Sequence, residues 1–441
     1  MEIGIGLGIT RFPGWGVMNI GQLFASGEQG AWYDPSDMST LWQDSAGTTP
    51  VTAVEQPVGR ILDKSGRGNH ATQATTTKRP VYSRRVNQML GSEQWNKSLG
   101  ADGTSTITEE LIDRPSFLNA ASVARVTKAA LFGGSTWYQY SLSQPVTQGA
   151  INTRSFFIKP IENCVSVLGN TGTDDPFYFS YNLQTGVLTP GANAGSVTVT
   201  QFPDGWYRFT VTQKVVEPSP SRIFAIVVNG VAGLPGVFLT TGYDSRLATD
   251  AHLPYQRVNT ATDYDADPSK FPAYLRVDGV DDSLASSTGG GGTTGFFFSA
   301  AISPQGSAGT ARTLFSDAGT NTGYIVRLNT SNQLELSAGN GTTYTTIATA
   351  GTLAVGSTDI VQAWDDGTNL NVKIGNGATA SIARPTVSAG TAGYTMGQDN
   401  GASTGYFNGR AYSTIYRKDS GLTQVQREAV ALYQRQKARM P

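Results

Sequence analysis

Apolar and polar residues alternate over most of the chain, and clusters of Gly, Asn, Asp, Pro and Thr interrupt this alternation. A period of two places successive side chains on opposite faces of a strand, so the pattern predicts a series of short strands. The turn clusters recur about every 8 to 12 residues, a spacing typical of a β-sandwich and not of alternating strands and helices. The clearest predicted strands are 155–161, 206–211, 222–228, 323–329 and 370–374.

One long helix is predicted, near residue 430. Thr423 and Gln426 have the spacing of a capping box, in which two side chains satisfy the first backbone N–H groups of a helix. Apolar residues then recur at helical spacing on one face, so we expect the helix to pack on its own domain and to carry no chemistry. These apolar residues are Leu422, Val425, Ala429, Leu432 and Tyr433.

The first residues form a separate pattern, in which Ile3, Ile5, Leu7 and Ile9 alternate with glycines. A strand of this sequence has one apolar face and one face of bare backbone, and it cannot fold alone. It is suited to docking on a partner or to extending the sheet of a neighbouring protein. We therefore expect residues 1–27 to form an arm that attaches the protein to a larger assembly.

The composition excludes several classes of protein. The chain has 441 residues, with 32 Lys and Arg against 33 Asp and Glu, and lacks the clustered cations of a nucleic-acid-binding protein. Its one cysteine (Cys164) and two histidines (His70 and His252) exclude a disulfide framework and a thiolate or polyhistidine metal centre. No stretch reaches the ~18 apolar residues of a membrane-spanning helix, and the first residues lack the basic segment of a Sec signal. We expect a soluble protein, folded in a reducing compartment.

Two short motifs resemble one known fold family. Residues 63–70 read DKSGRGNH and residues 274–284 read YLRVDGVDDSL. Both resemble motifs of the laminin-G and concanavalin-A-like modules in bacteriophage structural proteins, where the second motif normally follows soon after the first. Here a long segment separates them, which indicates that a second domain is inserted into the first.

The inserted segment contains further strings that are similar to parts of phage tail and virion proteins: QWNK at 94–97, PDGWYR at 203–208 and YQRVNTATDYD at 255–265. There they resemble jelly-roll, carbohydrate-binding-like modules. The implied fold is all-β: a concanavalin-A-like (laminin-G-like) β-sandwich interrupted by a second jelly-roll β-sandwich, with an extended N-terminal arm and one C-terminal helix. The expected segments are the arm (1–27), the first part of the laminin-G-like sandwich (28–85), the inserted jelly-roll domain (86–267) and the remainder of the first sandwich with the helix (268–441).

Catalytic residues are not expected. Hydrolases with a concanavalin-like sandwich usually carry two carboxylates on one strand in the pattern E-x-D-x-E, which this chain lacks. The acidic pairs at 281–282 and 365–366 stand in turn-like strings, where an Asp side chain bonds its own backbone. His70 lies inside the Gly-rich motif, and we expect it to be a hydrogen-bonded turn residue. No cofactor is expected.

The sequence contains one candidate metal site, a loose calcium site. Asp263 and Asp265 lie two residues apart, as acidic ligands do at the start of a calcium loop. The Gly and Glu that an EF-hand needs further along are absent, so only a looser site, completed by Asp278 or Asp281, remains open.

Sugar binding is the positive function that the residues suggest. A lectin-like site places an aromatic ring against the C–H face of a sugar and surrounds it with amide and carboxylate groups. An aromatic strand after a Gly-Gly-Ser-Thr loop and a second loop reading GNTGTDDP provide both kinds of group, whereas Trp206 and Tyr207 are expected to pack in the core. The candidate glycan-binding residues are Trp137, Tyr138, Tyr140, Asn170, Asp174 and Asp175.

The resemblance implies a non-enzymatic bacteriophage virion structural protein, assembled in the host cytoplasm and located in the virion. The leading expectation is a tail fibre or tail-associated appendage that contacts other virion proteins through its arm and host-surface polysaccharide through its sandwiches. A homo-oligomer is expected, with a trimer favoured, because symmetry and multivalency turn weak sugar contacts into avidity. The alternatives are a capsid decoration (cement) protein and a glycan depolymerase tailspike.

Overall fold

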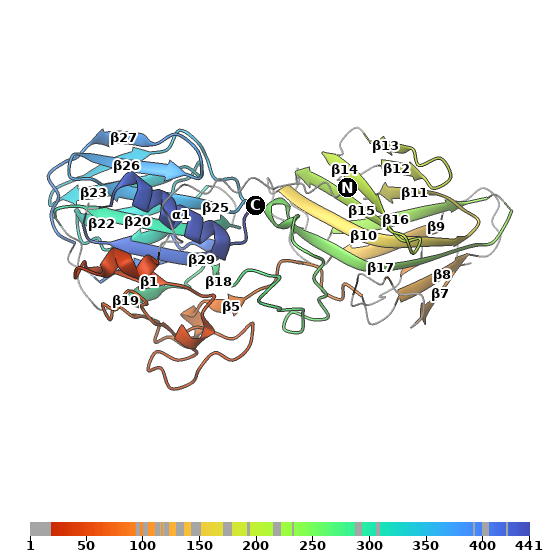
Figure 1. Cartoon of the computed structure of the whole chain (residues 1–441), viewed down its shortest axis with the longest axis horizontal. Coiled ribbons are helices and arrows are strands. Elements are labelled where there is room, and N and C mark those ends of the chain that lie inside the picture. Colours follow the sequence, from red (N-terminus) through yellow and green to blue (C-terminus); the bar gives the residue numbers. More distant parts are fainter. Residues whose placement is uncertain are drawn as a thin grey trace, which may run out of the picture.

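The described part of the computed structural model is built from antiparallel β-strands, short 3₁₀ helices and one α-helix. The strands form four sheets that pack in pairs, and the resulting two sandwiches lie side by side in Figure 1. This confirms the predicted fold class. The described residues are 19–441 except 94–97, 100–104, 111–114, 116–117, 119–122, 129–135, 143–150, 171–178, 192–194, 215–221, 232, 287–292, 306–308, 391–392, 399–404 and 420–421.

The outer sandwich consists of sheets A and B. Sheet A has the order β27 (Ala380–Ala383), β26 (Asn369–Ile374), β25 (Asp359–Asp365), β20 (Phe296–Pro304), β29 (Asn408–Arg417), β18 (Tyr274–Asp278) and β5 (Val81–Ser83), and β1 (Gly30–Tyr33) also pairs with β29. Sheet B has the order β2 (Leu41–Trp42), β3 (Arg60–Ile61), β4 (Ala71–Thr72), β19 (Leu284–Ser286), β28 (Thr395–Met396), β21 (Arg312–Ser316), β22 (Thr322–Leu328), β23 (Leu334–Asn340) and β24 (Tyr344–Ala348).

The inserted sandwich consists of sheets C and D, whose strands all lie between β5 and β18 in the sequence. Ser83 at the end of β5 pairs with Tyr274 at the start of β18, so the chain leaves and re-enters the outer sandwich at one place. Sheet C has the order β13 (Leu188–Pro190), β12 (Phe179–Asn182), β11 (Cys164–Asn170), β16 (Arg222–Gly230), β9 (Thr136–Leu142) and β6 (Ser98–Leu99). Sheet D has the order β14 (Ser196–Gln201), β15 (Tyr207–Lys214), β10 (Ile151–Glu162), β17 (Gly236–Leu247), β8 (Val123–Lys128) and β7 (Ser105–Glu110).

An aromatic cluster fills the centre of the outer sandwich. The ring of Phe315 on β21 lies 4.9 Å from those of Phe296 and Tyr394 and 5.2 Å from that of Tyr416, measured between centroids. These side chains come from both sheets and are buried, so each contributes apolar area and ring–ring contacts to the contact between the layers.

The motif DKSGRGNH forms a turn that is held by Asp63. One carboxylate oxygen of Asp63 accepts hydrogen bonds from the backbone N–H groups of Trp32 and Ser65, at 3.0 and 2.8 Å. The other accepts from the backbone N–H of Asn69 at 3.0 Å. His70 Nδ1 accepts a hydrogen bond from the backbone N–H of Asp63 at 2.9 Å, which confirms the prediction of a hydrogen-bonded turn histidine. The role of this motif is to stabilise the fold.

Helix α1 (Gln424–Lys437) covers the outer face of sheet A (Figure 1), where it contacts β20, β25 and β29. The predicted capping box is present: the side chains of Thr423 and Gln426 bond each other's backbone N–H groups. No helix in the described part of the chain is long and apolar enough to cross a membrane.

The buried face of α1 agrees with the predicted one only in part. Leu422 and Tyr433 pack in the cluster on sheet A, as predicted. Val425 and Leu432 are 46% and 59% exposed, whereas Val430 and Gln434 are fully buried. The Gln434 amide donates to the backbone carbonyl of Ser299 on β20 at 2.8 Å and accepts from the Ser299 hydroxyl at 2.6 Å. Gln434 can therefore be buried between α1 and sheet A, because its hydrogen bonds are satisfied there.

The described end of the predicted arm packs on the outer sandwich. The 3₁₀ helix η1 (Ile20–Phe24) buries Ile20, Leu23 and Phe24 in a cluster with residues of α1 and sheet A, including Trp364 and Val430. The arm residues Ile3, Ile5, Leu7 and Ile9 lie outside the described residues. The remaining 3₁₀ helices are η2 (Met38–Thr40), η3 (Thr76–Lys78) and η4 (Ala248–Asp250).

The two segments that connect the sandwiches are held together by buried polar contacts. Gln256 is fully buried, and its side-chain oxygen accepts from the backbone N–H groups of Val86 and Asn87 at 2.8 and 3.0 Å. Its amide donates to the backbone carbonyls of Arg84 and Asp265 at 3.0 and 2.8 Å. The outgoing segment 84–93 and the returning segment 248–271 are thus tied together at the junction.

Candidate functional site

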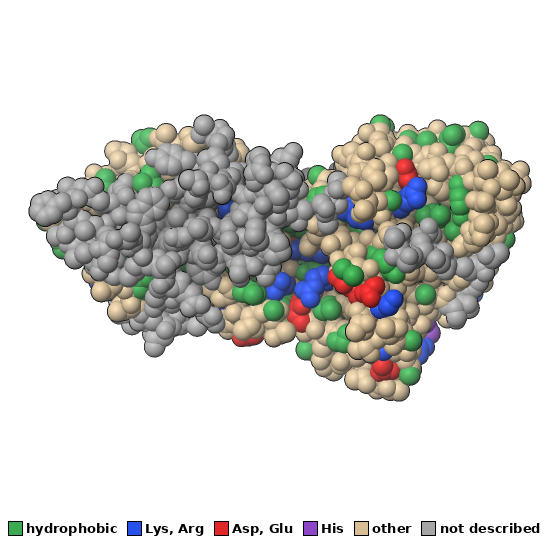
Figure 2. Space-filling model, turned by 180° about the vertical axis from the view of Figure 1, so that it is seen from behind, with side chains coloured by type: hydrophobic (Ala, Val, Ile, Leu, Met, Phe, Trp, Pro, Cys, Tyr) green, Lys and Arg blue, Asp and Glu red, His purple; other side chains and the backbone are tan. Residues whose placement is uncertain are grey.

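A cavity of about 660 Å³ lies on the outer face of sheet D, under the returning segment. We call it the junction pocket. Figure 2 shows Lys and Arg side chains gathered where the two sandwiches meet, with a few acidic ones beside them. The pocket is lined by Leu118, Phe157, Phe202, Arg208, Pro254, Tyr255, Arg257, Tyr264, Asp265, Ala266 and Lys270.

The alternation of side chains on β10 explains why an aromatic ring lies on this outer face. Phe156 and Ile158 point into the core between sheets C and D, so Phe157 points to the other side. There it packs in a second cluster with Trp206, which is fully buried. Phe157 pairs with Arg208 on β15, and the Arg208 guanidinium carbon lies 5.7 Å from the centroid of the Phe157 ring.

Two further rings surround Phe157. The ring of Phe202 lies 6.1 Å from it, and that of Tyr255 lies 6.3 Å away at an interplanar angle of 86°. The Tyr255 hydroxyl is 2.8 Å from the Ser92 hydroxyl and donates to the Glu93 carboxylate at 3.3 Å. Burial and the charge of Glu93 raise the pKa of Tyr255 well above its ordinary value, so its hydroxyl stays neutral.

The returning segment contributes charges that are mostly paired. Arg257 lies 3.4 Å from Asp263, and Lys270 lies 3.7 Å from Asp265 and 3.3 Å from Asp267. Asp263 and Asp265, two of the calcium candidates, therefore lie beside cations and outside the cluster of acids described next. Their positions do not support a joint calcium site with Asp278 or Asp281, because Arg257 and Lys270 already compensate their charges.

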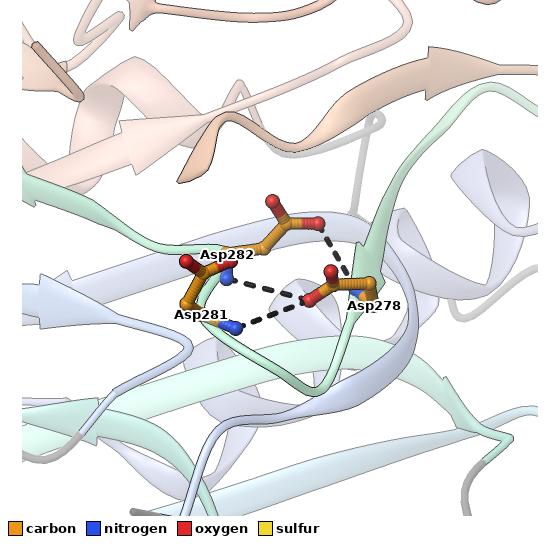
Figure 3. Close-up of side chains that lie close together, drawn as sticks. All are labelled: Asp278, Asp281 and Asp282. Carbon is orange, nitrogen blue, oxygen red and sulfur yellow. Dashed lines mark hydrogen bonds between the residues drawn. The ribbon is translucent and has the colours of Figure 1, made fainter. Parts of the chain in front are cut away.

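Asp278, Asp281 and Asp282 form the one group of three potential metal ligands found among the described residues, with carboxylate oxygens within 4.8 Å of one another (Figure 3). Their oxygens are also used within the turn. Asp278 Oδ1 accepts from the backbone N–H groups of Val280, Asp281 and Asp282, at 2.8, 3.3 and 3.4 Å. Asp282 Oδ2 accepts from the backbone N–H of Asp278 at 3.0 Å. The arrangement is that of a side-chain-capped turn, as expected for the 281–282 pair.

The acidic turn predicts a pH-dependent stability. Burial, with the charges of Asp278 and Asp281 next, raises the pKa of Asp282 from 3.8 to about 7. The folded state binds the extra proton, so this carboxyl costs stability as the pH rises from about 4 to about 7. We expect Asp282→Asn to raise the free energy of unfolding by at least about 1 kcal/mol at pH 8 and to leave it nearly unchanged at pH 4.

Denaturant unfolding at the two pH values, in buffer containing a chelator, measures this effect. Asp263→Asn is the matched control, because a hydrogen bond from Asn259 lowers the pKa of Asp263 and its replacement brings no gain at pH 8. Equal stability of Asp282→Asn and the unmodified protein at pH 8 would contradict the assignment.

The glycan-binding residues predicted from sequence lie on the other sheet. Trp137, Tyr138 and Tyr140 are on β9, and Asn170 ends β11; both strands flank β16 in sheet C. The junction pocket lies on sheet D, so the structure does not bring these residues to it. Their side chains are not described, and Asp174 and Asp175 lie outside the described residues.

The expected turn at 365–366 is confirmed, because both carboxylates accept hydrogen bonds from backbone N–H groups of the turn. Asp366 accepts from the backbone N–H groups of Thr368 and Asn369, as a turn residue does. Asp365 accepts from the backbone N–H of Gly367 at 2.8 Å. It also ends β25 and is fully buried, and it accepts hydrogen bonds from Arg384 and Tyr324, both at 2.6 Å. Its carboxylate is committed to a buried network and is not presented to a cleft.

Some of the pocket residues lie in the strings that resemble phage modules, but their role was not recognised: Arg208, Tyr255, Arg257, Tyr264 and Asp265. Trp206 and Tyr207 do pack in cores, as predicted, on opposite faces of sheet D. Arg208 follows them and lines the pocket. The signal in the sequence was the pair Phe156 and Phe157. Neighbouring residues of a strand point to opposite faces, so two consecutive aromatic residues indicate that both faces of that strand are covered.

Comparisons with known proteins give distant structural similarities. No family model matches the sequence, and no curated protein matches it. A carbohydrate-binding module (CBM40) of Ruminococcus gnavus IT-sialidase covers 33% of this chain and 96% of its own, with 11% identity and a TM-score of 0.28.

Two larger structures cover more of the chain. Domains LG4-5 of mouse laminin alpha1 cover 66% of this chain and 88% of their own, with 12% identity and a TM-score of 0.25. The tandem CBM22 domains of Paenibacillus barcinonensis Xyn10C cover 76% and 97%, with 11% identity and a TM-score of 0.24. We therefore derive the function from the residues of this chain.

Proposed function

We propose that this protein is a non-enzymatic glycan-binding protein and that the junction pocket is its sugar site. The observation that carries the proposal is the lining of a cavity of about 660 Å³ by aromatic rings together with a few charged groups. Small-molecule sites have this size and this mixture, with apolar walls for contact and few polar groups for orientation. Phe202 is a half-buried ring of the lining whose side chain carries no polar group, and its face is the surface against which we place a sugar ring.

We further propose that the protein is a bacteriophage virion component, most simply a tail fibre or tail-associated appendage attached by the segment 1–27. The support is the resemblance of its motifs to those of phage structural proteins, together with two sandwiches that leave a pocket at their junction. Quantitative mass spectrometry of purified virions measures the copy number. A small multiple of the tail symmetry is expected, and a count that follows the number of capsomers would instead establish a decoration protein.

Glycan binding is tested with the full chain on an array of bacterial polysaccharides, followed by calorimetry with the ligands found. We expect Phe202→Ala to weaken binding about tenfold, because it removes the ring–sugar contact. Tyr406→Ala, which removes a half-buried ring from the outer sandwich, is the matched control and should leave binding unchanged. Absence of binding to any carbohydrate would overturn the proposed function, and unchanged binding by Phe202→Ala would overturn the choice of pocket.

A further inference from the structure

Among the described residues that line the junction pocket, one cation has no acidic partner within ion-pair distance. Arg257 and Lys270 each lie within 4.0 Å of an Asp on their own segment. Arg208 has no carboxylate within ion-pair distance among the described residues; its guanidinium donates one hydrogen bond, from Nη2 to the Ser155 hydroxyl at 3.2 Å. Its Nε is buried and has no hydrogen-bond partner in the described part of the chain.

The surroundings of Arg208 explain why the fold leaves it unpaired. Asp244, an acid whose charge acts on Arg208, is already bound to Arg246 by two hydrogen bonds, and both side chains are buried. Burial lowers the pKa of Arg208, and the charges of Asp244 and Arg246 act on it in opposite directions. A partly desolvated guanidinium without a counter-ion is unfavourable, and an anion brought into the pocket relieves that cost.

We propose that the ligand of the junction pocket is an acidic glycan whose carboxylate binds Arg208. This inference rests on the proposed glycan-binding function and narrows it to sugars that carry a carboxylate. A guanidinium presents its N–H groups in a planar fork that matches the two oxygens of a carboxylate. Arg208 also lies over the ring of Phe157, which in turn is 6.1 Å from that of Phe202, so one ligand can contact a ring and the charge together.

The decisive experiment compares matched pairs of glycans on the full chain. The probes are uronic-acid and sialic-acid oligosaccharides, the same oligosaccharides with their carboxyl groups reduced to alcohols, and neutral and sulfated glycans. We expect each bound acidic glycan to bind at least about tenfold more tightly than its reduced form, and added salt to weaken only the acidic one.

Substitution of the arginine then assigns the effect to one residue. Arg208→Gln is expected to remove the difference between acidic and reduced glycans, and Arg208→Lys to restore part of it. Arg327→Gln is the control, because Arg327 lies on β22 in the outer sandwich, 2.7 Å from Glu335. The comparison of reduced and acidic glycans on the unmodified chain needs no variant, so the test holds even if an Arg208 variant does not fold.

The outcomes separate the inference from the function on which it rests. Equal binding of acidic and reduced glycans, or binding of neutral or sulfated glycans alone, overturns the carboxylate assignment and leaves glycan binding in place. Retention of the acidic preference in a folded Arg208→Gln variant overturns the role of Arg208. Absence of binding to every glycan overturns the proposed function, and with it this inference.

Discussion

Replacement of Asp250 by Ala is expected to lower the free energy of unfolding by about 3–5 kcal/mol. Asp250 ends η4 on the returning segment, and its carboxylate accepts a hydrogen bond from Arg410 of β29 at 2.6 Å. Both side chains are less than 5% exposed. The Arg410 guanidinium carbon also lies 4.9 Å from the centroid of the Tyr274 ring, so removal of the acid leaves a buried cation with an aromatic contact but no counter-ion.

Denaturant unfolding followed by fluorescence measures this loss. Asp263→Ala is the control, because Asp263 is 57% exposed in its pair with Arg257 and exposed pairs contribute at most about 1 kcal/mol. A double variant, Asp250→Ala with Arg410→Met, should recover part of the stability, since it removes the orphaned charge. A loss below 1 kcal/mol for Asp250→Ala would show that water reaches the pair.

Gln256→Ala is the second large effect that we expect, with a loss of about 3 kcal/mol or more. The substitution leaves two backbone N–H groups and two backbone carbonyls at the junction without partners, and each unsatisfied buried group costs about 1–3 kcal/mol. The affected groups belong to Arg84, Val86, Asn87 and Asp265.

Because these groups lie on both segments that connect the sandwiches, the variant should also open the junction. Limited proteolysis is therefore expected to cleave within 84–93 or 248–271 faster than in the unmodified chain. Gln184→Ala, at an exposed position in the inserted sandwich, is the control and should change stability by less than about 0.5 kcal/mol. Unchanged proteolysis of Gln256→Ala would mean that the remaining contacts alone hold the junction.

Both substitutions bear on the pocket as well as on stability. Tyr255, Arg257 and Asp265 belong to the returning segment, and Phe157 and Arg208 belong to sheet D, so the lining comes from both. A displacement of the returning segment therefore changes the shape of the pocket. We expect the Gln256→Ala variant to lose more glycan affinity than the Asp250→Ala variant, since Gln256 itself holds the carbonyl of Asp265.

Local patterns predicted the parts of the fold that depend on neighbouring residues. The alternation at 155–161, 206–211 and 323–329 corresponds to β10, β15 and β22. The capping box at Thr423 starts α1 because its hydrogen bonds join residues three apart. Likewise the turn held by Asp63 closes within eight residues. The bonds of the helix cap, and most of those of the turn, lie inside one short segment. For the strands, the alternation indicates which side chains face the core, although their hydrogen-bond partners are distant strands.

Contacts between distant segments decided the rest. The apolar pattern of α1 suggested a face with Leu432, but sheet A offers a serine there, so Gln434 is buried instead. The pocket brings Arg208 together with a segment that follows about 50 residues later, and the periodicity of the sequence does not predict this proximity. The sequence by itself determined the all-β class, the insertion and the family resemblance, because these follow from local pattern and motif. Only the tertiary structure decided that Asp250 pairs with Arg410 across the junction, and that Arg208 faces the pocket with no carboxylate within ion-pair distance among the described residues. Such contacts depend on distances between segments, which the order of residues does not contain.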